Sequence, residues 1–353
     1  MLVRRNRGRR GLAAVAVLVG ALTAPVGGAG VAEAAAPVPS AKTIRDLGTL
    51  SGGTSSLGRA VNDQGQVAGS GDTAGNSDHA FLWSASDGMQ DLGTLGGEAS
   101  SGEAINERGQ VVGRSNTEDG SPHAFLWSAS GGMRDLGTLG GRFSEAFGVN
   151  SQEQVTGTST TADNNTERAF LWSPSGGMQD LGTLSGGRSA VGRAINERGQ
   201  VAGYGETTDG NNHAFLWSAS GGMRDLGTFS GGTFSLGLAI NERGQVVGYG
   251  DTADGSVHAF LWSASGGMRD LGALSGGTST GLGVNTRGQV TGYSTTEDGS
   301  AHTYLWSASG GVRDLGTFSG GATSLGQSIN EWGQVVGYGD TADGTMHAFL
   351  WTP

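Results

Sequence analysis

The sequence predicts an all-β fold in which seven four-stranded sheets form a ring, and three observations support this expectation. Glycine accounts for 69 of the 353 residues without a collagen-type triplet, which favours a turn-dense β protein over helices. A motif of the form HAFLWSASGGMRDLGT (123–138) recurs along the chain. The aspartate of its DLG segment returns every 44 or 45 residues, at Asp46, Asp91, Asp135, Asp180, Asp225, Asp270 and Asp314. Four strand-like segments in a repeat of this length are typical of one blade of a β-propeller.

The four segments of one period can be assigned in order. The first ends in AIN (104–106), and the turn NERG (106–109) has the preferences of a type I turn closed by a left-handed glycine. The second is GQVVG (109–113), and a variable loop separates it from HAFLW (123–127), whose consecutive apolar residues fit a strand covered on both faces. A tight turn of constant length leads to the fourth, MRDLGTL (133–139). A second variable connection then leads to the next AIN, which we expect to be the innermost strand because small residues precede its asparagine.

The repeat is divided between the two ends of the repeat region, and this predicts how the ring closes. Residues 43–50 contain only a fourth strand, TIRDLGTL, whereas residues 319–353 contain only the first three. The sequence therefore predicts a single seven-bladed β-propeller over 43–353, in which the N-terminal strand completes the last blade and removes a free sheet edge. The predicted blades span about 51–95, 96–139, 140–184, 185–229, 230–274, 275–318, and 319–353 together with 43–50.

Residues 1–34 have the composition of an export signal. Five arginines precede an apolar stretch that is too short to span a bilayer comfortably, and AEA (32–34) supplies a small-x-small cleavage site. Residues 35–42 would form a short linker. General secretion is favoured over twin-arginine export, because GLAA after Arg9 and Arg10 matches the twin-arginine pattern poorly. We therefore expect a secreted, extracellular protein with no transmembrane anchor after removal of the signal.

Charge and residue usage argue against several classes of function. Cleavage after residue 34 removes five arginines and one glutamate, so the formal net charge changes from −11 to −15. Such a surface repels phosphate backbones, and nucleic acid is not expected as a partner. Without cysteine, the chain has no disulfide, thiol nucleophile or thiolate metal site. No nucleophile elbow, zinc motif or phosphate loop is recognisable, so no catalytic residue is predicted.

The motifs HAFLW, DLGTLGG and IN-RGQVVG resemble those of the exported HAF-repeat family of bacteria, and the resemblance covers nearly all of residues 43–353. That family is similar in period to kelch and WD-repeat propellers. The resemblance implies an exported repeat protein. It implies no established activity and supplies no catalytic residues.

Two repeated sets of polar residues have structural interpretations. All six histidines occupy the first position of HAFLW, and we expect each to form a hydrogen bond at a strand start, because equivalent atoms on different blades do not converge on a metal. The DLG aspartates are interpreted in the same way. The loops between the second and third strands carry paired acids without the alternate-position spacing of calcium loops. No metal or cofactor is predicted, with calcium as an alternative to simple turn formation.

A half-ring of tyrosines is the main candidate for ligand binding. The candidate residues are Tyr204, Tyr249, Tyr293 and Tyr338, with Asp209 and Asp254 of the adjacent loops. At the tyrosine position, blades 1 to 3 have Ser70, Arg114 and Thr158. Tyrosines beside carboxylates at the edge of the variable face suit sugar stacking or peptide binding, and ordinary edge packing is the alternative. Trp332, at a tight turn on the opposite face, either contacts a ligand or packs against a neighbouring blade.

The sequence thus predicts a binding scaffold for an extracellular glycan or protein. A lyase or hydrolase that acts on polysaccharide is one alternative, and a structural or adhesive surface protein is another. Near-identical blades argue against an enzyme, because catalysis needs an asymmetric cluster of acids and bases whereas repeats supply rings.

Overall fold

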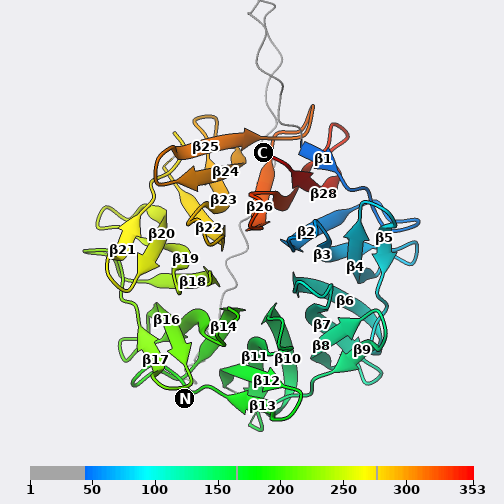
Figure 1. The fold of residues 1–353 in the computed structure, drawn as a ribbon, viewed down its shortest axis with the longest axis horizontal. Coiled ribbons are helices and arrows are strands. Elements are labelled where there is room, and N and C mark those ends of the chain that lie inside the picture. The colour runs from blue at the N-terminus through cyan, green and yellow to red at the C-terminus, as the bar shows by residue number, and fades with distance from the viewer. Residues whose placement is uncertain (1–43, 164–165, 276) are drawn as a thin grey trace, which may run out of the picture. The chain divides into compact units, whose positions relative to one another are not determined.

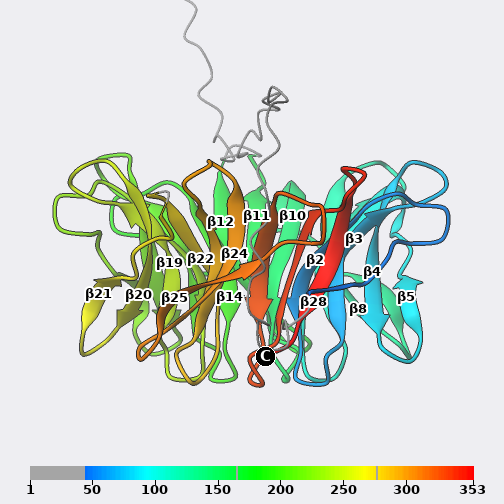
Figure 2. The ribbon, with the colours of Figure 1, turned by 90° about the horizontal axis from the view of Figure 1, so that it is seen from above.

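The seven repeats form seven four-stranded antiparallel sheets, which stand around a common axis as the blades of a propeller (Figure 1). The computed structural model describes residues 44–163, 166–275 and 277–353, and every helix or strand assigned in these ranges is a β-strand. The predicted seven-bladed β-propeller is therefore confirmed. The strands run between the two faces of the ring (Figure 2). The predicted signal peptide (1–34) and linker (35–42) lie outside the described residues.

Each of the first six blades runs from its inner to its outer strand in chain order. Blade 1 consists of β2 (Ser56–Val61), β3 (Val67–Asp72), β4 (Asp78–Ser84) and β5 (Gly88–Asp91). Blade 2 consists of β6 (Gly96–Ile105), β7 (Val111–Thr117), β8 (Pro122–Ser128) and β9 (Gly132–Asp135). Blade 3 consists of β10 (Gly140–Val149), β11 (Val155–Thr161), β12 (Glu167–Ser173) and β13 (Gly177–Asp180).

The remaining blades follow the same order, except that the last one takes its outer strand from the start of the chain. Blade 4 consists of β14 (Ala190–Ile195), β15 (Val201–Glu206), β16 (Asn212–Ser218) and β17 (Gly222–Asp225). Blade 5 consists of β18 (Ser235–Ile240), β19 (Val246–Asp251), β20 (Val257–Ser263) and β21 (Gly267–Asp270). Blade 6 consists of β22 (Ser279–Val284), β23 (Val290–Thr295), β24 (Ala301–Ser307) and β25 (Gly311–Gly316). Blade 7 consists of β26 (Ser324–Ile329), β27 (Val335–Asp340), β28 (Met346–Trp351) and β1 (Ile44–Asp46).

The two ends of the repeat region meet in blade 7, as predicted. Strand β1 pairs with β28 in antiparallel register, with Asp46 opposite Phe349, and the carboxylate of Asp46 lies 2.8 Å from Nδ1 of His347. The neighbouring Arg45 places its guanidinium 4.9 Å from the ring centre of Trp83 in blade 1. Ser56 Oγ, also in blade 1, donates to the carbonyl of Gly48 at 2.6 Å. These contacts join blade 7 both to its own fourth strand and to blade 1.

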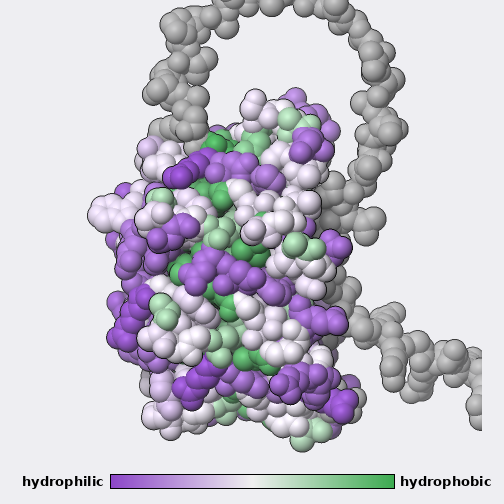
Figure 3. Space-filling model, turned by 90° about the vertical axis from the view of Figure 1, so that its right-hand side faces the viewer, coloured by the Kyte–Doolittle hydropathy of each residue, from purple (hydrophilic) through white to green (hydrophobic). Residues whose placement is uncertain are grey.

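The apolar core lies between neighbouring blades. In one cluster, Phe125 and Trp127 of blade 2 pack with Ala80 and Leu92 of blade 1, and the Phe125 side chain is fully buried. Burying a side chain of this size contributes about 1.5–3 kcal/mol before conformational entropy is subtracted. Because the HAFLW strand is covered on both faces, its run of consecutive apolar residues has the predicted explanation. Figure 3 shows the outer side of the ring, where hydrophobic residues are visible mainly in the recesses between hydrophilic ones.

The connection between blades is a strand rather than a loop in two places, which corrects the sequence prediction. In blade 1, the N–H of Gly53 donates to the carbonyl of Leu50 and closes a turn. Blades 2 and 3 lack the serine that lies within this turn, and glycines follow Leu95 and Leu139 directly. Without the turn, β6 and β10 continue outward and reach ten residues each.

A closed ring of asparagine hydrogen bonds joins the blades at the tight turns. Nδ2 of each AIN asparagine donates to the carbonyl of the asparagine in the next blade, at 2.9–3.2 Å, and the last of these bonds runs from Asn330 back to Asn62. Within the turn of blade 1, Asn62 Oδ1 accepts from the N–H groups of Gln64 and Gln66, and Nδ2 also donates to Gln66 Oε1. All seven asparagines are buried. The repeated asparagine of IN and glutamine of GQ therefore stabilise the turn, and the asparagine also bonds to the next blade.

Candidate functional site at the central channel

The inner strands surround a cavity of about 280 Å³ on the axis of the ring. Each blade contributes the three residues that precede its AIN-type asparagine, so the expectation that this strand is innermost is confirmed. The middle residue of each triplet is small because neighbouring inner strands approach closely. A Cβ placed on Gly148 would lie 3.1 Å from Cα of Ala194 in the next blade.

The first residue of each triplet breaks the symmetry of the repeat. In blade order these residues are Arg59, Glu103, Phe147, Arg193, Leu238, Leu282 and Gln327. Charged and aromatic side chains thus line the channel in blades 1 to 4, whereas leucines line it in blades 5 and 6. The repeat supplies the ring, and this single variable position makes the ring amphipathic.

Two ion pairs lie in the charged half of the ring. Arg59 Nε is 3.9 Å from a carboxylate oxygen of Glu103, and Arg114 Nη1 is 3.7 Å from one of Glu145. Burial raises the pKa of Glu145, although Arg114 and Arg193 both favour its charged form. The arginine of blade 4 has no such partner. The guanidinium of Arg193 lies over the ring of Phe147, 4.0 Å from its centre.

The four candidate tyrosines lie on the second strands of blades 4 to 7, beside the channel residues. All four are half-buried. The guanidinium of Arg59 lies 5.4 Å from the ring centre of Tyr338, and burial, together with Tyr293 and Tyr204, raises the pKa of Tyr249 to about 12. The tyrosines therefore form a half-buried row on the second strands of blades 4 to 7. Their role in binding stays a prediction.

Among the described residues, the candidate carboxylates, Asp209 and Asp254, bond within their own loops rather than to the tyrosines. Thr252 Oγ1 donates to Asp254 Oδ1, and with the bonds from Ser256 this lowers the pKa of Asp254 to about 2. Asp209 is held in the same way by Thr207 and Asn211. Neither carboxylate hydrogen-bonds to a tyrosine in the part of the chain that the structure describes. Their contacts are those of turn-forming residues.

Trp332 is the one large hydrophobic residue among those described that is strongly exposed, with 67% of its surface accessible. Its indole Nε1 donates to the carbonyl of Asp63 in blade 1 at 3.0 Å. The side chain therefore contacts the neighbouring blade, and most of its surface remains open to solvent. It belongs to the tight-turn end of the molecule, with the asparagine ring.

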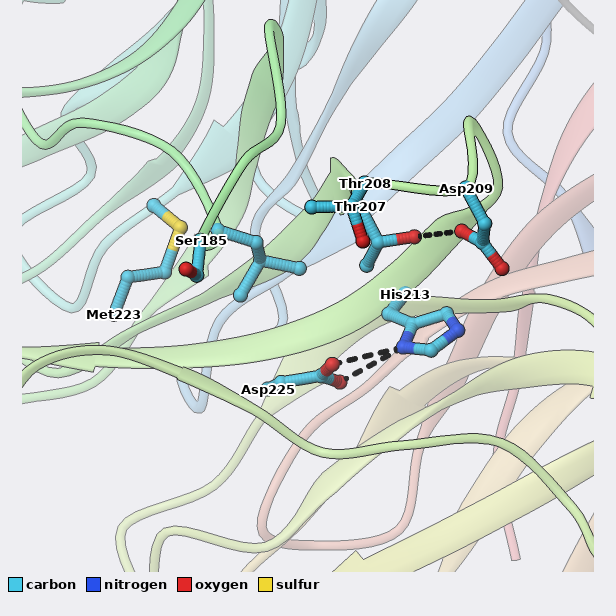
Figure 4. A pocket seen from close by; sticks show the side chains of 8 residues that line it. Ser185, Thr207, Thr208, Asp209, His213, Met223 and Asp225 are labelled. Carbon is cyan, nitrogen blue, oxygen red and sulfur yellow. Dashed lines mark hydrogen bonds and ion pairs between the residues drawn. The ribbon is translucent and has the colours of Figure 1, made fainter.

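A second recess, of about 390 Å³, lies on blade 4 (Figure 4). Asp209 and the His213–Asp225 pair line it, and His213 Nδ1 lies 2.9 Å from a carboxylate oxygen of Asp225. The same histidine–aspartate pair occurs in every blade except blade 3, which has Arg168 instead. The fixed spacing of twelve residues between the two motifs places the two side chains on adjacent strands. The predicted hydrogen bond at the strand start is thus present. Among the described residues, no group of three or more histidines and acids is placed to hold a metal ion.

The channel residues Arg59, Glu103 and Arg193 were not among the sequence candidates. One signal was available, because the residue three positions before each asparagine changes chemical class while its neighbours do not. What the sequence does not display is that these residues, about 44 positions apart, lie side by side.

Several solved structures share this fold. The β-propeller domain of the Trilobed protease from Pyrococcus furiosus has a TM-score of 0.55 and 12% identity, covering 84% of this chain and 95% of that one. Virginiamycin B lyase from Staphylococcus aureus has a TM-score of 0.52 and 12% identity, covering 85% of this chain and 96% of that one. At such low identity the likeness shows the β-propeller class alone. No protein-family model matches the sequence, and no curated protein matches it.

Proposed function

We propose that this protein is an exported β-propeller that acts as a binding scaffold for an extracellular glycan or protein. The observation that carries the proposal is the amphipathic ring around the channel, in which paired charges face leucines and a row of tyrosines. A specific ligand needs such a break in symmetry, because a uniform ring presents the same contacts in every direction.

The tyrosine row suits a ligand that has both apolar and hydroxyl groups. Half-buried rings offer a face for stacking and keep a polar tip within reach of a hydrogen-bonding partner. The channel offers fixed charges beside this surface. Carbohydrates and polar peptides combine the two kinds of group.

Export is the part of the proposal that rests on sequence alone. It is supported by the arginine-rich start, the apolar stretch and AEA (32–34), and by the resemblance to exported HAF-repeat proteins. Among the described residues, no helix is long and apolar enough to cross a membrane. Intact mass of protein recovered from the medium should correspond to a chain that begins at or near Ala35. Full-length protein found only inside the cell contradicts export.

The binding function is tested by screening. Protein secreted from the full-length gene is applied to arrayed glycans and to insoluble cell-wall material, and retained protein is quantified. We expect saturable retention on a limited set of glycans or on a surface protein. Protein that is folded by circular dichroism, and that none of these materials retains, contradicts the proposal.

A further inference from the structure

Three arginines lie at or beside the channel, and only two of them have an acidic partner. Arg59 is paired with Glu103 and Arg114 with Glu145. Arg193 lines the cavity, yet among the described residues its guanidinium makes neither an ion pair nor a hydrogen bond. Its Nε atom is buried without an acceptor. The three charged side chains that line the cavity, Arg59, Glu103 and Arg193, carry a formal net charge of +1.

The contact of Arg193 with Phe147 leaves the donors of the guanidinium available. A cation that lies over an aromatic ring uses its face, while its N–H groups remain free for an acceptor. The planar fork of an arginine matches the two oxygens of a carboxylate better than it matches a single hydroxyl. An unpaired arginine that lines a cavity is therefore suited to a ligand carboxylate.

The opposite half of the channel has no charge in its lining. Leu238 and Leu282 line it, and Tyr249 and Tyr293 lie in the second strands of the same two blades. A ligand that reaches both halves needs an anionic group at one side and a face of C–H groups at the other. The volume of about 280 Å³ limits the part that enters the channel to one or two sugar-sized units.

We propose that the channel binds the end of a glycan that carries a uronic acid, with the sugar carboxylate on Arg193 and the apolar face of the ring against the tyrosine and leucine side. This inference rests on the proposed binding function and names its ligand class. The formal net charge of the whole chain is −11, so an extended acidic polymer is repelled from the outer surface whereas a single chain end is not.

The test compares two probes with the same sugar framework, one with free carboxylates and one in which they are methyl esters. Digalacturonic acid and its methyl ester are titrated into the secreted protein by isothermal titration calorimetry. We expect the acid to bind at least tenfold more tightly than the ester. In Arg193→Gln this preference should disappear, whereas Arg198→Gln, an exposed arginine at the tight turn of the same blade, should keep it. Melting temperatures of both variants establish that they are folded.

Each other outcome has a distinct meaning. If acid and ester bind equally, or if Arg193→Gln keeps the preference, the uronate inference is wrong while glycan binding stands. If an acidic peptide binds through Arg193 and the uronate does not bind, the ligand class is wrong and the scaffold function stands. If neither saccharide binds and the screen on glycans and cell-wall material is also negative, both proposals fail.

Discussion

In six of the seven tight turns, a single asparagine side chain makes four hydrogen bonds, and Asn285 of blade 6 makes three. Asn241 accepts from the N–H groups of Arg243 and Gln245, and it donates to Gln245 Oε1 and to the carbonyl of Asn285 in the next blade. The side chain is buried, so none of these partners can turn to water without a local opening of the structure.

Replacing this asparagine should therefore lower the free energy of unfolding by more than the loss of a small side chain would. We expect Asn241→Ala to lower the free energy of unfolding by about 3 kcal/mol, because several buried polar groups lose their partner together. Arg243→Ala changes an exposed residue of the same turn and should stay within about 0.5 kcal/mol of the parent protein. Urea unfolding measures both, and equal midpoints would contradict the role of the ring.

The buried carboxyl of Glu145 predicts a dependence of stability on pH. Burial raises its pKa in the folded state above the ordinary value of 4.5. Below about pH 4.5 the carboxyl of Glu145 is protonated in both states, so its burial does not reduce stability. Stability is lost as the pH rises through the folded-state pKa, because the charged carboxylate is buried at a cost. Glu145→Gln removes the loss, so the variant should gain stability relative to the parent between about pH 4 and about pH 7.

The control for this change is Glu98→Gln, which alters an exposed glutamate on β6. For this variant, the difference in free energy of unfolding from the parent protein should be the same at about pH 4 and at about pH 7. Urea unfolding at the two pH values provides the measurement. A Glu145→Gln variant that loses stability at neutral pH would show that the ion pair with Arg114 outweighs the burial of the carboxyl.

The tyrosine row makes a prediction about affinity. Once a ligand is identified, Tyr249→Ala and Tyr293→Ala should each weaken binding by about 1 kcal/mol or more, the scale of a lost aromatic contact. Trp332→Ala, at the tight-turn end, should leave affinity unchanged. If Trp332 is the sensitive position and the tyrosines are indifferent, the ligand binds the other face.

At the scale of elements, the short strand β1 has more contacts than its three residues suggest. It pairs with β28, and the segment that follows buries Leu47 and Leu50 in the cluster shared with blade 1. Its Asp46 supplies the partner of His347. One segment thus completes one blade and covers the next.

Removing residues 44–50 should lower the free energy of unfolding by roughly 5 kcal/mol or more, because two buried leucines and a strand pairing are lost together. A protein that begins at residue 43 is the matched control and should be as stable as the parent. Thermal unfolding of the two proteins gives the comparison. Identical melting temperatures would mean that β1 does not hold the ring closed.

At the scale of the whole molecule, the ring of blades was predictable because the sequence consists of similar repeats, one for each blade. The number of blades followed from the spacing of the DLG aspartates, and the closure followed from the half repeats at 43–50 and 319–353. The long strands β6 and β10 were not predicted, because a missing serine in a turn looks like an ordinary loop change.

The channel was less predictable for a physical reason. Along one inner strand, Arg59 or Glu103 is an unremarkable polar residue between small ones. Only the packing of blade 1 against blade 2 places these two side chains 3.9 Å apart, and Arg193 lies over Phe147 of the preceding blade. A chemical site that is assembled from seven separate repeats has no local signature in any of them.

The position of β1 also sets the order in which the molecule can form. Asp46 and His347 are separated by 301 residues, so β1 can pair with β28 only when the two ends of the repeat region come together. Blades 1 to 6 draw all four of their strands from contiguous chain and can assemble as they emerge. The last blade is completed by the pairing of β1 with β28, which are far apart in the sequence. Because bringing them together costs much loop-closure entropy, we expect this pairing to form late. Until β1 has paired with β28, the ring is not closed and β28 remains an unpaired sheet edge.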